Sequence, residues 1–193
     1  MNKGNTDLAE NRTFENEVFD AGNPLTGTCE ECLFLGCGFT GAELSGVTFR
    51  NCTFERCDFT LAGMKNAALQ QALFRRCRLQ GVQFGDCRTF LLELRFEECM
   101  MRFATFLKLS LKETVFRTCD LQEADFTEAD LTGASFAESD LLKAVFHHTN
   151  LEKADFRTAV NYSINPETNR LRKARFSLPG VTGLLDTYGI EIE

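Results

Sequence analysis

The most regular feature of the chain is an apolar residue at every fifth position from 121 to 156. These positions alternate Leu and Phe, and the residue two places earlier is small each time: Ala124, Ala129, Ala134, Ser139, Ala144, Thr149 and Ala154. An α-helix repeats near 3.6 residues and a β-strand near two, so a period of five fits neither as one long element. It fits a solenoid that turns at every repeat, with one large and one small residue per repeat pointing inward.

An earlier run has the same period. Its centres lie at every fifth position from 34 to 84, and each residue two places before a centre is Cys, Ala or Val. The next centres, Leu91 and Phe96, are shifted by two residues, because seven residues and not five separate Phe84 from Leu91. The shift predicts a bulge or outward loop within 85–91, which either bends the rod or is a tolerated surface insertion.

Many repeats read Ala, then Asp or Asn, then Leu or Phe, as in Ala124-Asp125-Phe126. This pattern, over 34–156, resembles that of the pentapeptide-repeat family. The resemblance implies an all-β fold, a right-handed quadrilateral β-helix with about twenty residues per coil and about 4.8 Å between stacked strands. Repeats two apart would then occupy opposite sides. In 96–156 the Phe residues would therefore stack on two opposite sides, and the Leu and Met residues on the other two.

The N-terminal residues 1–33 keep the phase only at Phe14 and Phe19, and Asn23-Pro24 interrupts it. We expect them to form a coil that caps the solenoid, because an open end would expose apolar side chains. The polar start of the chain lacks the apolar region of a signal peptide. The sequence also has no run of about 18 apolar residues, the length that a membrane-spanning helix needs. These features predict a cytoplasmic protein.

The C-terminal end changes character after Phe156. A turn-rich segment, 161–169, interrupts the repeats, yet Phe176 lies twenty residues beyond Phe156 and predicts one last coil. We divide the chain into a β-helix over 1–177 and a short helix with a tail over 178–193. The helix is predicted from the i, i+3, i+4, i+7 spacing of an apolar stripe and ends at Gly189, after which Ile190 and Ile192 alternate as in a strand. The stripe either covers its own coil or meets a second copy, and the residues predicted for dimerisation are Leu178, Val181, Leu184, Leu185 and Tyr188.

The nine cysteines are better explained by the repeat than by metal or disulfide chemistry. Eight fall two places before a centre, and Cys29 falls on a centre, so we predict buried free thiols that pack as small apolar residues. The alternative, a zinc site at the Cys29–Cys32 pair, lacks the second pair that such sites require.

Catalytic chemistry has little support in the sequence. The two histidines, His147 and His148, occupy outward positions, and the chain has neither a phosphate-binding loop nor a dinucleotide-binding glycine motif. A convex solenoid side offers no cleft in which a catalytic pair could be placed. We predict a protein that is not an enzyme and holds no cofactor or metal.

Charge is uneven along a chain whose net charge is −7. The segment 65–112 has nine basic and four acidic residues, and its role is left open. The segment 120–140 has no Lys or Arg and seven acidic residues: Asp120, Glu123, Asp125, Glu128, Asp130, Glu138 and Asp140. We predict that they form a partner-binding surface, because regularly spaced carboxylates present negative charge as duplex DNA presents phosphates. The alternative is that these positions are polar only for solubility.

The segment 159–185, AVNYSINPETNRLRKARFSLPGVTGLL, resembles the ends of topoisomerase-protecting pentapeptide-repeat proteins of the albicidin-resistance, microcin-immunity and quinolone-resistance type. The resemblance implies a homodimer joined through the C-terminal segment. It also implies a DNA mimic that binds DNA gyrase or a related type II topoisomerase and protects it from poisons, without binding nucleic acid or a membrane. The alternative is a general interaction scaffold with another partner.

Overall fold

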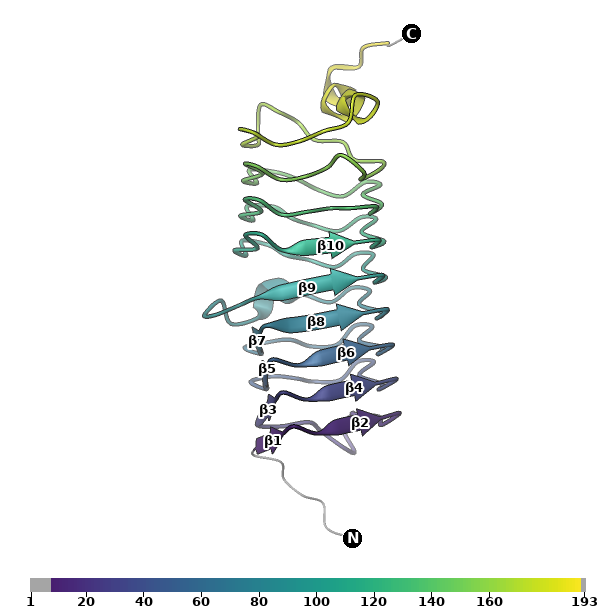
Figure 1. Cartoon of the computed structure of the whole chain (residues 1–193), viewed down its shortest axis with the longest axis vertical. Helices are drawn as coiled ribbons and strands as arrows, with labels where there is room; N and C mark the ends of the chain where they lie inside the picture. The colour runs from purple at the N-terminus through teal and green to yellow at the C-terminus, as the bar shows by residue number, and fades with distance from the viewer. Residues whose placement is uncertain (1–7, 192–193) are drawn as a thin grey trace.

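A computed structural model describes residues 8–191 as a rod of stacked coils, with the two ends of the chain at opposite ends of the rod (Figure 1). The chain returns to the same side after twenty residues, so that Phe34 pairs with Phe54 in parallel register. Short strands on two adjacent sides form two parallel sheets. The structure confirms the predicted all-β solenoid.

The four sides can be named in chain order. Side 1 holds the four-stranded sheet of β1 (Leu8–Glu10), β3 (Thr28–Glu30), β5 (Thr48–Arg50) and β7 (Ala68–Gln70). Side 2 holds the six-stranded sheet of β2 (Thr13–Glu15), β4 (Leu33–Leu35), β6 (Thr53–Glu55), β8 (Ala72–Arg75), β9 (Leu94–Glu97) and β10 (Val115–Arg117). On sides 3 and 4, successive coils are connected by single β-bridges, for example Met100 to Asp120 on side 3 and Thr105 to Asp125 on side 4.

The turn at most corners comes from the residue two places after a centre. These residues have left-handed backbone angles, as at Asn51 (φ 51°), Lys108 (φ 60°) and Glu123 (φ 56°). A left-handed residue costs most side chains free energy, yet it bends the chain so that the next repeat starts a new side. The five-residue period is therefore one short extended segment plus one corner.

Stacked Phe rings fill the interior. On side 2 they form one column from Phe14 to Phe176, with successive centroids between 4.7 and 5.4 Å apart. In the second run another column, starting Phe84–Phe106–Phe126, stands on side 4. The two opposing Phe columns predicted for 96–156 are confirmed.

At the predicted register shift the chain forms an outward loop, and the Phe rings inside the rod stay stacked. Strands β8 and β9 pair with a spacing of twenty-two residues, Phe74 on Phe96, and the two rings stack 5.4 Å apart. Before the loop, Phe84–Asp86 forms a single 3₁₀ turn, η1. The loop itself projects sideways just before β9 (Figure 1). The prediction that Leu91 is a centre is wrong: its side chain is 63% exposed, and Leu92 packs against the core instead.

The N-terminal region is more regular than the sequence indicated. Residues 8–33 form a coil of the ordinary kind, in which Phe14 stacks on Phe34 and Phe19 on Phe39. A tight turn between Asp20 and Asn23 absorbs the interruption. The guanidinium of Arg12 lies 4.6 Å from the centroid of the Phe14 ring and covers part of this end. The first seven residues lie outside the described part of the chain.

The C-terminal end has the predicted last coil, since Phe176 stacks on Phe156 at 5.3 Å. The expected helix is present as two consecutive 3₁₀ turns, η2 (Gly180–Leu184) and η3 (Asp186–Tyr188), because Pro179 and two glycines disfavour a longer α-helix. Gly189 ends η3 with φ 61°, as expected. The predicted strand at Ile190 is not formed, and Ile192 lies outside the described residues.

All nine cysteines are buried and free, which confirms the prediction for the core. Burial raises the pKa of Cys29, Cys52 and Cys87 to about 12. Six of the nine thiols donate hydrogen bonds to backbone carbonyls of the preceding coil, as from Cys57 Sγ to Phe34 O at 3.4 Å. They act as small core residues with a satisfied weak donor.

Candidate interaction surface

The seven predicted acidic residues are distributed around the whole rod. Asp120 and Asp140 bridge each other on side 3, as the spacing indicated, while Asp125 lies on side 4 and Asp130 on side 1. The remaining three occupy corners, because each lies two places after a centre and has a left-handed backbone: Glu138 between sides 2 and 3, Glu123 between sides 3 and 4, and Glu128 between sides 4 and 1. The structure does not bring all seven onto one surface.

Three of the seven are paired with cations of the preceding coil. Arg102 Nε lies 2.6 Å from Asp120 Oδ2, Lys108 Nζ lies 3.7 Å from Glu128 Oε2, and Lys112 Nζ lies 3.4 Å from Asp130 Oδ2. Burial by itself raises the pKa of Asp130. Hydrogen bonds from Thr132 and the charge of Lys112 outweigh burial and hold this pKa below its usual value. These pairs remove much of the negative charge that the sequence counted.

The other four acids form no ion pair among residues 8–191, although Asp140 and Glu123 lie near enough to Arg102 for their charges to raise its pKa. Asp140 accepts from Gln122 Nε2 at 2.7 Å and from Asn161 Nδ2 at 2.9 Å. Within the same coil, the backbone N–H of Thr127 donates to Asp125. Glu123, Asp125, Glu138 and Asp140 all lie on side 3, on its two corners or on the adjoining side 4. The structure therefore narrows the predicted acidic surface to this half of the rod.

The basic middle region contains an arginine cluster that the sequence did not reveal. Glu97, only 3% exposed on side 2, pairs with Arg75 at 3.1 Å, Arg95 at 3.0 Å and Arg117 at 2.9 Å. The arginines come from β8, β9 and β10, three successive strands. The twenty- and twenty-two-residue spacings from Arg117 and Arg75 to Glu97 are the signal that would have predicted the cluster once the coil length was known.

Several exposed apolar side chains were also missed. Phe90 is 75% exposed in the outward loop, and Leu61, Met100, Phe103 and Leu107 are exposed on sides 3 and 4. Each lies at an outward position of the repeat, and that mismatch between residue type and position is the signal in the sequence. His147 and His148 are exposed as predicted, with ring centroids 4.1 Å apart.

The residues predicted for dimerisation are split between two environments. Leu184 packs against the protein's own core, and Leu185 is half-buried. Leu178 is 88% exposed, Val181 38% and Tyr188 48%, and the Tyr188 hydroxyl donates to Glu167 Oε1 at 3.1 Å. The stripe therefore covers its own last coil with one part and leaves another part open.

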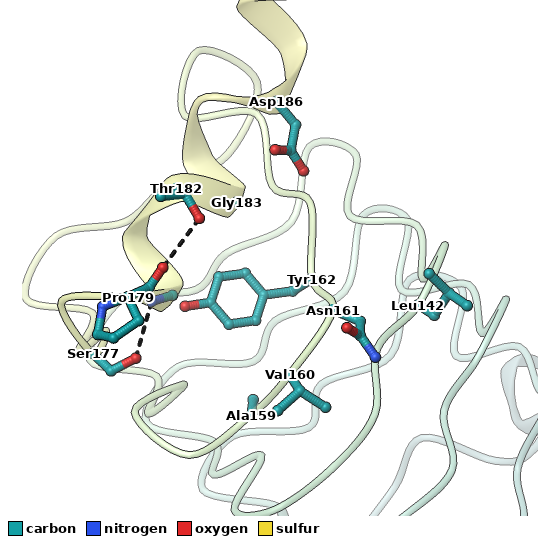
Figure 2. Close-up of a pocket in the computed structure, with 11 residues that line it drawn as sticks. Leu142, Ala159, Val160, Asn161, Tyr162, Ser177, Pro179, Thr182, Gly183 and Asp186 are labelled. Carbon is teal, nitrogen blue, oxygen red and sulfur yellow. Dashed lines mark hydrogen bonds between the residues drawn. The ribbon is translucent and has the colours of Figure 1, made fainter. Parts of the chain in front are cut away.

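A groove of about 510 Å³ separates side 3 from the C-terminal turns. Figure 2 shows the Tyr162 ring beside the segment from Ser177 to Gly183, pointing toward Pro179, with Leu142 on the far side of the groove. A side chain at Gly180 or Gly183 would collide with Tyr162, so these glycines let the segment pack closely. The Tyr162 hydroxyl is buried without a partner among the described residues, and burial raises the pKa of Tyr162.

The described part of the chain, 8–191, contains no group of three His, Cys, Asp or Glu side chains suited to a metal ion. None of its helices has the length and apolar character that a membrane span requires. The arrangement offers charged and apolar surfaces along a rigid rod.

Comparison with known proteins identifies the repeats. A model described as a pentapeptide repeat region matches 28–106, and one described as pentapeptide repeats (8 copies) matches 119–157. No curated protein matches the chain.

Solved structures share the fold at low sequence identity. Two trypsin-treated variants of QnrB1, a plasmid-mediated fluoroquinolone resistance protein, are 17% and 18% identical, with TM-scores of 0.57 and 0.52. Both cover 96% of this chain, and the matches span 98% and 99% of theirs. HetL, involved in heterocyst differentiation in the cyanobacterium Nostoc sp. strain PCC 7120, is 14% identical over 89% of this chain and 84% of its own, with a TM-score of 0.47. The repeat models, the stacked four-sided coils and the five-residue period agree: the chain belongs to the pentapeptide-repeat family.

Proposed function

We propose that this protein mimics DNA: it binds the DNA-contacting surface of DNA gyrase, or of a related type II topoisomerase, and protects the enzyme from a poison. The observation that carries the proposal is the coil 119–138, which has six acidic residues and no Lys or Arg. Three of the six are paired with the preceding coil, and Glu123, Asp125 and Glu138 remain. One coil rises about 4.8 Å, and duplex DNA carries about three charges over that length.

Two further observations support this function. The tail 159–185 resembles the tails of topoisomerase-protecting proteins, and the rod fold is the one found in QnrB1, a fluoroquinolone resistance protein. On this proposal the protein acts by binding rather than catalysis, in the cytoplasm where gyrase works. It has no affinity for nucleic acid at the acidic coil, because carboxylates repel phosphates.

The proposal is tested with purified protein and gyrase in supercoiling and drug-induced cleavage assays, with and without poisons. We expect binding that weakens as salt rises, because exposed charges are screened over about 10 Å at 0.1 M. Glu123→Lys combined with Asp140→Lys should weaken binding at low salt without unfolding the rod. The matched control is Glu31→Lys combined with Glu113→Lys, an equal double reversal at exposed corners on the far side of the rod. A wild-type protein that neither binds gyrase nor changes cleavage at low salt would refute the proposal.

We also propose a two-fold homodimer through the open part of the C-terminal stripe. Leu178→Asp with Val181→Asp should then give a monomer in light scattering. Leu8→Asp with Val18→Asp is the control, because both side chains are exposed (57% and 60%) and lie in the first described coil, at the opposite end of the rod. Wild-type protein that is monomeric at micromolar concentration would contradict the dimer.

The alternative function is a general interaction scaffold. It is favoured by the basic middle region 65–112, which an acidic DNA mimic does not need. If gyrase activity and drug-induced cleavage are unchanged by the protein, the scaffold is the better description.

A further inference from the structure

Four exposed apolar side chains gather at the corner between sides 3 and 4. We call them the apolar corner: Leu61 (68% exposed), Phe103 (55%), Met100 (43%) and Leu107 (42%). Leu61 and Phe103 belong to the corner itself, with Gly81 between them along the rod axis, as the backbone hydrogen bonds from Leu61 N to Gln80 O and from Gly81 N to Arg102 O show. Met100 lies on side 3 just before Phe103, and Leu107 on side 4 just after it.

The exposure of Phe103 is unusual for this molecule. Of nineteen Phe residues, only Phe90 and Phe103 are exposed, and every other one is in the core or packs against it. The Leu61 side chain lies over Gly81, where a side chain would collide with it, so the apolar surface extends along the corner. A contiguous apolar surface on a folded protein usually marks a contact with a partner.

The charge next to the apolar corner is negative. Glu123 follows Phe103 in the same corner column, Asp120 bridges Met100, and Asp125 bridges Thr105. The two cations beside the apolar corner, Arg102 and Lys108, already form ion pairs, with Asp120 and Glu128 respectively. Glu123 and Asp125 form no ion pair with Lys, Arg or His in residues 8–191, and Lys143, which follows Glu123 in the corner column, lies one coil further from Phe103. The unpaired charges nearest to Phe103 are therefore those of carboxylates.

From this juxtaposition we infer that the apolar corner and the adjoining carboxylates form one docking surface for a basic protein surface that carries exposed apolar side chains. Proteins that bend DNA have such surfaces, because they place Phe, Leu, Ile, Met or Pro among Lys and Arg and insert them between base steps. A purely acidic mimic would leave those apolar side chains exposed to water or against charge. The apolar corner receives them while Glu123 and Asp125 pair with the surrounding cations.

This inference deepens the proposed function, and with gyrase as the partner it rests on that function. The test compares Phe103→Ser with Phe90→Ser. Both residues are exposed Phe side chains, but Phe90 lies in the outward loop between sides 4 and 1, outside the apolar corner. We expect Phe103→Ser to weaken gyrase binding about tenfold or more with an unchanged salt dependence, and Phe90→Ser to change it less than about twofold. Glu123→Gln should instead reduce the salt dependence.

Two outcomes overturn the inference while leaving gyrase binding intact. One is equal affinity for gyrase in wild type and Phe103→Ser. The other is a change in the oligomeric state of free protein with Phe103→Ser, since the apolar corner would then be covered by a second copy. Thermal melting of both variants verifies that the rod remains folded.

If wild-type protein does not bind gyrase, the proposed function fails and a second measurement decides the inference. Two synthetic lysine-rich peptides serve as probes, one with two leucines and one with serine at the same positions, and binding is followed by fluorescence anisotropy. The inference predicts tighter binding of the leucine peptide, a preference that Phe103→Ser removes and Phe90→Ser keeps. Equal binding of the two peptides overturns it.

Discussion

The two runs of repeats on either side of the outward loop have the same backbone but reach it with different side chains. In the first run the second Phe column stands on side 3, where Phe39 and Phe59 stack 4.3 Å apart. In the second run it stands on side 4, opposite the column on side 2, which continues through both runs. Two places before a centre, the most frequent residue is Cys in the first run and Ala in the second. The interior therefore requires a pattern of large and small residues rather than particular ones.

The outer surfaces of the two runs differ in a way that matters for function. The end of the first run and the start of the second carry the basic residues and the apolar corner, and the coil 119–138 carries acidic residues alone. Outward side chains contribute little to the stability of a coil, so they are free to differ. Recognition of partners is therefore determined by the outward positions, where the two runs are least alike.

The largest effect should come from removing one ring from either Phe column. Phe54→Ala in the first run and Phe126→Ala in the second each empty a fully buried site between two stacked rings. Each should lower the free energy of unfolding by about 3–5 kcal/mol, measured by denaturant titration. Thr127→Ala, on the outer surface, should cost about 0.5 kcal/mol or less. Very different losses at Phe54 and Phe126 would show that the two interiors are not equivalent.

A smaller loss of stability is expected between the two runs, where Glu97 forms ion pairs with three arginines. Glu97→Gln should cost about 1–3 kcal/mol at neutral pH, because hydrogen bonds to charged groups are lost and the arginines repel one another. Glu98→Gln is the control, since Glu98 is exposed and pairs only with Arg76. An equal cost at Glu98 would contradict a special role for the buried carboxylate.

The contribution of Glu97 to the free energy of unfolding should also depend on pH. Burial raises the pKa of Glu97, but the hydrogen bond from Arg75 and the charges of Arg117 and Arg95 outweigh burial and lower it below the ordinary value of 4.5. A carboxyl group whose pKa is lower in the folded state stabilises the fold above its unfolded pKa, and this stabilisation is lost as the pH falls through the folded pKa. The difference between wild type and Glu97→Gln should therefore shrink as the pH is lowered below 4.5.

The cysteines of the first run should be replaceable by the alanine that the second run uses. Cys57→Ala and Cys77→Ala each remove a weak hydrogen bond to the preceding coil, at 3.4 and 3.3 Å, and should cost about 1 kcal/mol. In wild type the burial of all nine thiols should make labelling by a thiol reagent slow, and denaturant should release nine free thiols. Fewer thiols, or fast labelling of folded protein, would contradict the description of the core.

The smallest effect is expected from deleting Phe90 and Leu91. The deletion restores a coil of twenty residues, and because Phe74 already stacks on Phe96 the free energy of unfolding should change by only about 0.5 kcal/mol. Deleting Thr132 and Gly133 from the regular second run is the control, and it should be strongly destabilising because every later side chain would change position. A large loss from the first deletion would show that the loop itself holds the two runs together.

The sequence predicted the interior well because the repeat determines it. Phe126 and Ala124 could be placed inward by counting, and both are fully buried. Leu91 was misplaced because both Leu91 and Leu92 are apolar, and only the packing of the loop decides which one enters the core. The sequence predicted a capping coil in the N-terminal region but not its regularity, because the tight turn at Asp20 to Asn23 changes the local spacing without changing the stack.

The candidate surface could be predicted only in part. Counting placed Asp120 and Asp140 on one side, but it could not show that Arg102 neutralises Asp120, since that contact depends on how two side chains from neighbouring coils turn toward each other. It also could not separate Leu184, which packs inward, from Leu178, which does not. Charge and hydropathy along the sequence therefore identified the candidate residues, and the coil geometry decided which of them a partner could reach.

The twenty-residue return of the chain has a consequence for how this rod forms. Every ladder contact joins residues about one coil apart, which is roughly a tenth of the chain length, a separation typical of fast-folding helical bundles rather than of β-sandwiches. A coil can be added as soon as the one before it exists, so folding can begin at any coil and spread in both directions. Pulling on the two ends should reverse this process in steps of one coil, with each step releasing about twenty residues.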